Sequence, residues 1–239
     1  MRSEWFVVTL ALTAVFFPSL SRCQAIPEEA IHHTNQLTAE NNVYRGFRRE
    51  LGPRETAEVG HITRDEVLIV LCESGTELTV RRADSSIEKL LNGNVRFLAA
   101  GTTAQVQNGN GDKAQIIIIE LKKHWDDEMR PCAAPRNCSH VIRIGDQPIG
   151  ETTDLFTNGF VTVQQHRLSR GGTLTSSYFS ATGKHHLFFT ALSELHASFD
   201  GNEEELTRGE TSLSDASQVE ISAGKGEARW VVIRVQDVS

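Results

Sequence analysis

The stretch FLAAGTTAQVQNGNGDKAQIIIIELKK, residues 97–123, decides the fold class of this chain. It predicts a strand, a tight turn at Gly101, a second strand, a polar turn at NGNGDK and a final apolar strand. The consecutive isoleucines place apolar side chains on both faces of the last strand, as in a strand that lines a barrel and also meets a second sheet. We interpret the stretch as the closing part of a small β-barrel.

Short segments of the same kind occupy most of the remaining sequence. They include VYRGFRREL, VLIVL, ELTVRR and VRFLAA, and turn signals such as ESG and NGN separate them. No helical periodicity lasts for more than about two turns. Many short strands at this spacing predict an all-β sandwich or barrel.

The strand pattern occurs twice along the chain. NNVYRGFRREL at 41–51 aligns with NGFVTVQQHRL at 158–168, an offset of about 117 residues, and AQIIIIEL aligns with ARWVVIRV at an offset of about 114. Near-constant offsets indicate an internal duplication. We therefore predict two barrels, residues 41–122 and 156–237, joined by a linker at 123–155.

The first residues of the chain read as a targeting segment. Residues 1–25 carry Arg2, a long apolar run interrupted by proline, and then small residues, which is typical of a secretory signal peptide and too short for a transmembrane helix. We expect export to the periplasm or the cell exterior, no membrane span in the mature chain, and an extended arm at 26–40. Lipidation of Cys23 is the alternative, but Arg22 stands where a small residue is needed.

Export determines how the remaining cysteines are interpreted, because oxidising compartments allow disulfides to persist. Cys132 and Cys138 lie close together in the Pro-rich segment RPCAAPRNCSH, which predicts a local disulfide in the linker. A thiolate metal site is the alternative, and His140 is the one further ligand type nearby. Cys72, inside VLIVLC, is interpreted as a buried apolar residue.

The charge balance excludes one class of partner. The 239 residues include 24 Lys and Arg against 31 Asp and Glu, which gives a formal net charge of -7. Binding to nucleic acid depends on a basic surface that neutralises phosphates. We therefore expect no nucleic-acid partner.

Two segments of the first repeat resemble the motifs of a known family. They are AEVGHITRDEVLIVLCESG and FLAAGTTAQVQN, and they are similar to the two motifs of the cupins, in particular of small secreted bacterial bicupins. The resemblance implies two tandem double-stranded β-helix, or jelly-roll, barrels. In the family, G-x5-H-x-H-x3,4-E-x6-G and G-x5-P-x-G-x2-H-x3-N supply three imidazoles and a carboxylate, which bind one divalent Fe, Mn, Ni, Cu or Zn ion inside the barrel.

The first repeat keeps half of that ligand set. Glu66 stands at the family's Glu position and His61 at its second His position. Val59 and Ala104 replace the other two imidazoles, while Asn108 matches the final Asn. We therefore expect no metal cofactor, and we interpret His61 and Glu66 as a hydrogen-bonded pair at the barrel mouth. A weak divalent-metal site on these two residues is the alternative.

The second repeat departs further from the family pattern. His186 stands at the Glu position with His185 beside it, and the closing segment SDASQVEISAGKGEARW contains no histidine. Adjacent residues of a strand point to opposite faces, so at most one of these two imidazoles faces the interior. His166 is a candidate to approach it from a neighbouring strand.

Two function hypotheses follow. The first is an exported, metal-free bicupin that serves as a small-molecule binding or structural module; the alternative is a cupin-type dioxygenase, isomerase or lyase with a reduced His/Glu metal site. Whether the chain is an enzyme stays open, since no nucleophile or phosphate-binding motif is recognisable. A small-molecule ligand and a homodimer are the expected partners. The candidate ligand-binding residues are His61, Glu66, Asn108, His166 and His186.

Overall fold

The computed structural model describes residues 35–72, 77–122, 129–132, 138–175, 185–216 and 218–236. The predicted signal peptide, Cys23 and the first part of the predicted arm lie outside these residues. Regular structure in the described part is almost entirely β-strand, so the all-β prediction is confirmed. No helix among the described residues is long and apolar enough to cross a membrane.

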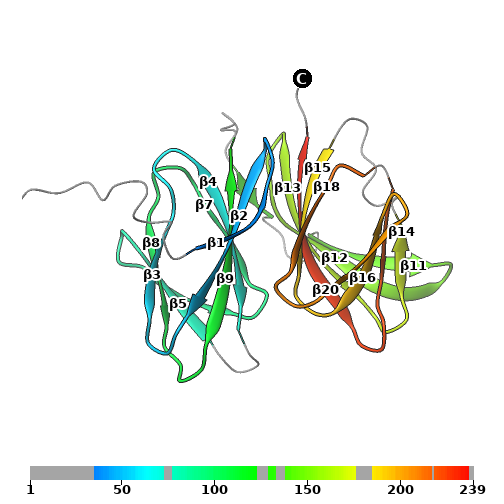
Figure 1. The fold of residues 1–239 in the computed structure, drawn as a ribbon, viewed down its shortest axis with the longest axis horizontal. Helices are drawn as coiled ribbons and strands as arrows, with labels where there is room; N and C mark the ends of the chain where they lie inside the picture. Colours follow the sequence, from blue (N-terminus) through cyan, green and yellow to red (C-terminus); the bar gives the residue numbers. More distant parts are fainter. Residues whose placement is uncertain are drawn as a thin grey trace, which may run out of the picture. The chain divides into compact units, whose positions relative to one another are not determined.

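The strands fall into two halves of the sequence (Figure 1). The first half contains β1 (Gln36–Glu40), β2 (Tyr44–Leu51), β3 (Thr56–Val59), β4 (Asp65–Leu71), β5 (Glu77–Arg82), β6 (Ile87–Leu91), β7 (Val95–Leu98), β8 (Ala104–Asn108) and β9 (Ala114–Leu121). The second half contains β10 (Arg130–Pro131), β11 (Ser139–Ile144), β12 (Gln147–Thr157), β13 (Val161–Leu168), β14 (Thr173–Thr175), β15 (His185–Ala191), β16 (Leu195–Phe199), β17 (Asn202–Leu206), β18 (Thr211–Ser214), β19 (Val219–Ser222) and β20 (Ala228–Gln236).

Each half forms two antiparallel sheets. In the first half the orders are β1-β2-β9-β4-β7 and β3-β8-β5-β6; in the second they are β10-β12-β13-β20-β15-β18, with β11 also paired to β12, and β14-β19-β16-β17. The central trio β2-β9-β4 corresponds to β13-β20-β15. The arrangement is a jelly roll, as the sequence predicted, and the boundaries 41–122 and 156–237 for two separate barrels stay a prediction.

Two segments that were expected to be irregular contain strands. Residues 36–40 of the predicted arm form β1 and pair with β2, with Glu40 opposite Arg45. Most of the predicted linker forms β10, β11 and the first part of β12, which extend the larger second-half sheet. These outer strands are largely exposed, so they are held by backbone pairing and lack the apolar pattern by which strands are recognised.

The predicted disulfide is present. Cys132 and Cys138 are bonded, with their Cα atoms 6.0 Å apart, and the bond connects the end of β10 to the start of β11. Cys72 is a buried thiol, as predicted.

Buried apolar side chains form three clusters. The first interior cluster draws on both sheets of the first half and includes Leu51, Val59, Leu68, Val70, Ala104, Ile116 and Ile118. The second interior cluster draws on both sheets of the second half and includes Leu168, Phe189, Ala197, Ile221 and Trp230. The shared cluster joins the two halves and includes Tyr44, Val67, Ile69, Ile117, Ile119, Phe188, Ile233 and Val235.

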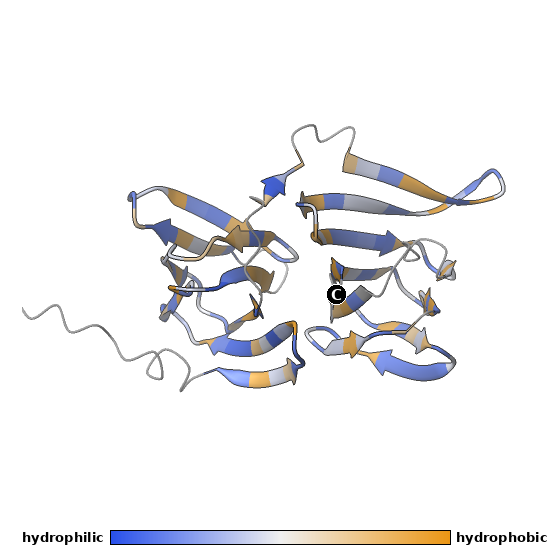
Figure 2. Cartoon of the chain, turned by 90° about the horizontal axis from the view of Figure 1, so that it is seen from above, coloured by the Kyte–Doolittle hydropathy of each residue, from blue (hydrophilic) through white to orange (hydrophobic). Residues whose placement is uncertain are grey.

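Strand alternation explains how one strand serves two clusters. Ile116 and Ile118 of β9 belong to the first interior cluster, whereas Ile117 and Ile119 belong to the shared cluster. The isoleucine run is therefore buried on both faces, as the sequence predicted. Bands of hydrophobic and hydrophilic residues alternate along many of the other strands (Figure 2).

Candidate functional site

The two positions at which the sequence resemblance expects an imidazole lie opposite each other in the first half. Val59 of β3 and Ala104 of β8 are directly paired across the sheet, and both are buried. Both side chains belong to the first interior cluster. An aliphatic contact therefore stands where the family places two metal ligands.

Glu66 is the family's carboxylate position, and it lies on the interior face of β4. Leu68 and Val70 share that face and belong to the first interior cluster. The carboxyl group is 4% exposed, and its Oε2 atom accepts a 2.8 Å hydrogen bond from the Gly60 N–H. Burial raises the pKa of Glu66 to about 7; the Gly60 hydrogen bond lowers it, and the nearby charge of Glu120 raises it. Glu66 therefore keeps a proton over much of the acidic range.

The glycine before His61 determines this arrangement. Gly60 has a φ of +101°, and a Cβ atom there would collide with the Thr102 carbonyl oxygen. Only glycine allows the chain to turn here and direct its N–H at Glu66. His61 then lies in the β3–β4 connection, where its Nδ1 accepts a 3.1 Å hydrogen bond from the Thr63 N–H. The described hydrogen bonds of Glu66 and His61 go to Gly60 and Thr63, and the interpretation of the two residues as a hydrogen-bonded pair stays a prediction.

Glu120 is a second buried carboxylate that the sequence reasoning missed. It pairs directly with Glu66 across β9 and β4, and it has no exposed surface. Arg64 donates from Nη1 to Glu120 Oε2 at 2.8 Å. The sequence signal that could have found Glu120 is its place directly after the isoleucine run, at a position that faces the interior.

The residues present do not fit the family's metal site. Val59 and Ala104 offer no donor atom, Glu66 accepts from the Gly60 N–H, and His61 Nδ1 is bonded to the N–H and the hydroxyl of Thr63. Dehydrating a divalent ion requires several donors in a fixed geometry. We therefore derive no chemistry through a bound metal in this interior.

Asn108 has a structural role. Its buried Nδ2 lies 3.1 Å from the Leu51 carbonyl oxygen, 3.0 Å from that of Gly52 and 2.7 Å from that of Asp112. These contacts connect the end of β8 to the end of β2 and to the β8–β9 turn. The side-chain amide of Asn108 therefore stabilises the backbone at the end of β8 opposite to Ala104.

In the second half, His166 faces the interior. Its ring stacks on Trp230, with centroids 5.0 Å apart and planes 9° apart, and its Nδ1 is 2.9 Å from Thr152 Oγ1. Burial lowers the pKa of His166 to about 3, while Asp154 raises it and Arg234 lowers it. The imidazole is therefore neutral at physiological pH.

His186 lies on the opposite face of the same sheet. It pairs with Val235, and its face is that of Phe188 in the shared cluster. Its Nδ1 is 2.5 Å from Asp215 Oδ1. The structure thus does not bring His166 and His186 together, and the side chain of His185 lies outside the described part of the chain.

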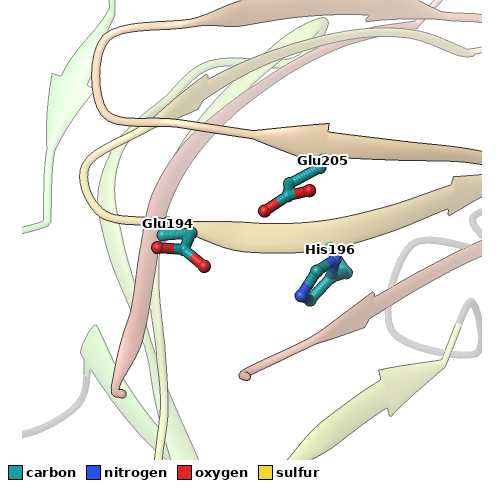
Figure 3. A group of neighbouring side chains, drawn as sticks. All are labelled: Glu194, His196 and Glu205. Carbon is teal, nitrogen blue, oxygen red and sulfur yellow. The ribbon is translucent and has the colours of Figure 1, made fainter. Parts of the chain in front are cut away.

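A cluster of potential metal ligands lies on the surface of the second half. Glu194, His196 and Glu205 come from the start of β16 and from β17, and their ligand atoms all lie within 4.8 Å of one another (Figure 3). His196 and Glu205 are directly paired, on the face opposite to the buried Ala197. The signal that could have found them is E-x-H on one strand followed by NEEEL on the next. All three are exposed, so the cluster lies outside both interior clusters.

Two adjoining pockets form what we call the seam groove: one pocket lies on the second half, and the other is lined by residues of both halves. Its charged end has a volume of about 400 Å³ and is lined by Glu151, Thr153, Gln165, Arg167, Glu227 and Arg229 among others. Its apolar end has a volume of about 440 Å³ and is lined by residues that include Val95, Leu155, Phe156 and the disulfide of Cys132 and Cys138. Thr153 and Gln165 line both ends, so the two pockets adjoin at these residues.

Comparison with known proteins identifies the fold. Neither a protein-family model nor a curated protein matches the sequence. Among solved structures, the chain is similar to protein YlbA from E. coli (14% identity, TM-score 0.58, covering 82% of this chain and 79% of that one). It is also similar to a cupin 2 conserved barrel domain protein from Leptotrichia buccalis (12% identity, TM-score 0.52, covering 84% of this chain and 88% of that one).

A third similar structure carries the name of an enzyme. Salicylate 1,2-dioxygenase from Pseudaminobacter salicylatoxidans matches with 10% identity and a TM-score of 0.52, over 81% of this chain and 71% of that one. At these identities the likeness shows the fold. The chain has the fold of these cupin structures, so the resemblance seen in the sequence is confirmed at the level of the fold.

Proposed function

We propose that this chain is an exported, metal-free cupin that serves as a small-molecule binding or structural module. The observation that carries the proposal is the direct apolar pairing of Val59 with Ala104 at the two lost imidazole positions. The Cys132–Cys138 disulfide supports export, because disulfides persist in oxidising compartments.

The remaining polar groups of the first half support the same conclusion. Glu66 is bonded to the Gly60 N–H, and Glu120 is paired with Arg64. Recruiting these carboxylates to a metal would break contacts that compensate their burial, and breaking a buried charge pair costs about 3–5 kcal/mol. The fold itself is compatible with enzymes and with other proteins, so the ligand positions decide between the hypotheses.

The first experiment measures the metal content. Protein purified without a His tag from the secreted fraction should contain less than about a tenth of a metal equivalent per chain, since a filled four-ligand site would retain roughly one. A content near one would contradict the proposal and favour the cupin-type metalloenzyme. The intact mass of the same preparation tests cleavage of the predicted signal peptide, because a chain that retains residues 1–25 would contradict it.

The second experiment restores the lost ligands. In the variant Val59→His with Ala104→His, two imidazoles would join His61 and Glu66, and we expect Mn²⁺ or Ni²⁺ to bind at least about tenfold more tightly than to the wild type. Isothermal titration calorimetry measures the gain, after circular dichroism has shown that the variant is folded. Adding His61→Ala should remove most of it.

Val80→His with Val106→His is the matched control. These two valines are also directly paired in the first interior cluster, but Val106 lies further along β8 than Ala104, and Val80 lies on β5. The control should show no comparable gain. Tight metal binding by the wild type, or equal affinity in wild type and the folded first variant, would contradict our assignment of the ligand positions.

A further inference from the structure

We propose that the seam groove binds a small molecule that has an apolar body and one carboxylate, with the carboxylate at Arg229. The inference deepens the proposed function and rests on its binding role. Ligand sites of a few hundred Å³ commonly occur where two parts of a fold meet, with apolar walls and a few placed polar groups. The seam groove has this composition, and its two ends have different chemistry.

The charged end contains an arginine pair. Arg167 of β13 and Arg229 of β20 are directly paired, so two like charges face the same pocket. Like charges directly opposite each other on a sheet are destabilising. An anion placed between them relieves this repulsion.

The available carboxylates compensate only one of the two arginines. Glu227 Oε2 accepts from Arg167 Nε at 2.7 Å, and Glu151 lies directly opposite Arg167 in the register of β12 with β13. The guanidinium of Arg229 makes no hydrogen bond or ion pair with any residue that the structure describes, although the residue is half-buried. Its charge is therefore the one available for a carboxylate, which guanidinium binds in a bidentate geometry.

The β6–β7 turn holds Arg229 beside the apolar end. A Cβ atom at Gly93 would lie 3.2 Å from Arg229 Nη2 and 3.3 Å from Gln165 Nε2, so the turn passes very close to both side chains. Gly93 has a φ of +79°, which a side chain rarely tolerates. Gly93 itself lines the apolar end, so a carboxylate on Arg229 places the attached body there.

The apolar end offers a surface for that body. Val95, Leu155 and the disulfide contribute to its walls, and Phe156 is supported by Phe97 at a centroid distance of 6.4 Å. The two charged residues that also line this end have hydrogen-bond partners within the protein. Arg96 Nε donates to Glu88 Oε1 at 2.7 Å, and Asp154 Oδ1 accepts from Gln164 Nε2 at 2.7 Å.

The test uses simple probes on the full mature chain. Hexanoate, phenylacetate and 4-phenylbutyrate are the carboxylates, and 4-phenylbutanamide is the neutral analogue of the last. Ligand-observed NMR and calorimetry should give a Kd below about 1 mM for at least one carboxylate, and binding at least about tenfold weaker for the amide. Arg229→Gln should weaken carboxylate binding by at least about tenfold, and Arg229→Lys should restore part of it.

Arg81→Gln is the matched control, because Arg81 is an exposed arginine of the first half outside the groove and its replacement changes the net charge equally. It should leave the affinity unchanged. The inference is overturned if no carboxylate binds at 10 mM (about the weakest binding of interest), if the amide binds equally well, or if Arg229→Gln has no effect. If the protein contains no metal and binds none of the carboxylates, this inference is refuted and the proposed function stands. If it contains about one metal ion per chain and still binds a carboxylate through Arg229, the proposed function is refuted and this inference stands.

Discussion

The two halves differ in the type of titratable side chain that they bury, a carboxyl in the first and an imidazole in the second. Each half places a titratable side chain on the interior face of its central strands: Glu66 opposite Glu120 in the first, and His166 opposite Trp230 in the second. Burial disfavours the charged form of both, so it raises the pKa of the carboxyl and lowers that of the imidazole. The interiors therefore hold these titratable residues as neutral or paired groups, and this difference can be tested by pH.

The largest effect is expected from the second half. His166 has a pKa of about 3 in the folded chain and about 6.5 when unfolded, so below pH 6.5 the unfolded state takes up a proton that the folded state refuses. Stability is complete above pH 6.5 and falls by about 5 kcal/mol as the pH drops to 3. In His166→Phe this loss should disappear. Urea unfolding at several pH values measures it, and the exposed His196→Phe, which should keep the wild-type dependence, is the control.

A second test concerns the first half, and its sign is reversed. Glu66 has a pKa of about 7 in the folded chain against 4.5 for the free group, so the folded state binds the proton more tightly. Its contribution is fully present below pH 4.5 and is lost as the pH rises through 7, by about 3 kcal/mol. Glu66→Gln should remove this dependence between pH 5 and 8 (roughly the range set by the two pKa values).

The control for that variant is Glu58→Gln, an exposed glutamate on β3. It should behave as the wild type does. If the stability of Glu66→Gln still fell with rising pH as steeply as that of the wild type, Glu66 would not be the group that titrates. The contrast between the interiors of the two halves would then no longer hold for the first half.

Local patterns were sufficient to predict much of the fold. The isoleucine run predicted a strand buried on both faces, and the short Cys132–Cys138 spacing, in a chain expected to be exported, predicted the disulfide. Both features depend on neighbouring residues in the sequence. By contrast, β11 and the outer part of β12 were missed because strands exposed on both faces carry no apolar alternation.

The candidate sites depend on strand register, which one sequence does not contain. Glu66 meets Glu120 only because β4 and β9 pair in one register; a shift of one residue would place them on opposite faces. In HHLFF both faces of the strand are buried, so the pattern could not show which way His186 points. Arg167 and Arg229 likewise become neighbours only through the pairing of β13 with β20.

The smallest effect is expected at the surface cluster of Glu194, His196 and Glu205. These exposed donors converge, but they are fully hydrated, and fewer than four protein ligands leave positions to water. Added Zn²⁺ should therefore bind weakly, and His196→Ala should weaken it further by roughly tenfold, about 1.4 kcal/mol. His61→Ala is the matched control and should leave the Zn²⁺ affinity unchanged, because His61 belongs to the β3–β4 connection of the first half. If His61→Ala weakened Zn²⁺ binding and His196→Ala did not, the interior of the first half would be the metal-binding region, and its description as a metal-free interior would have to be abandoned.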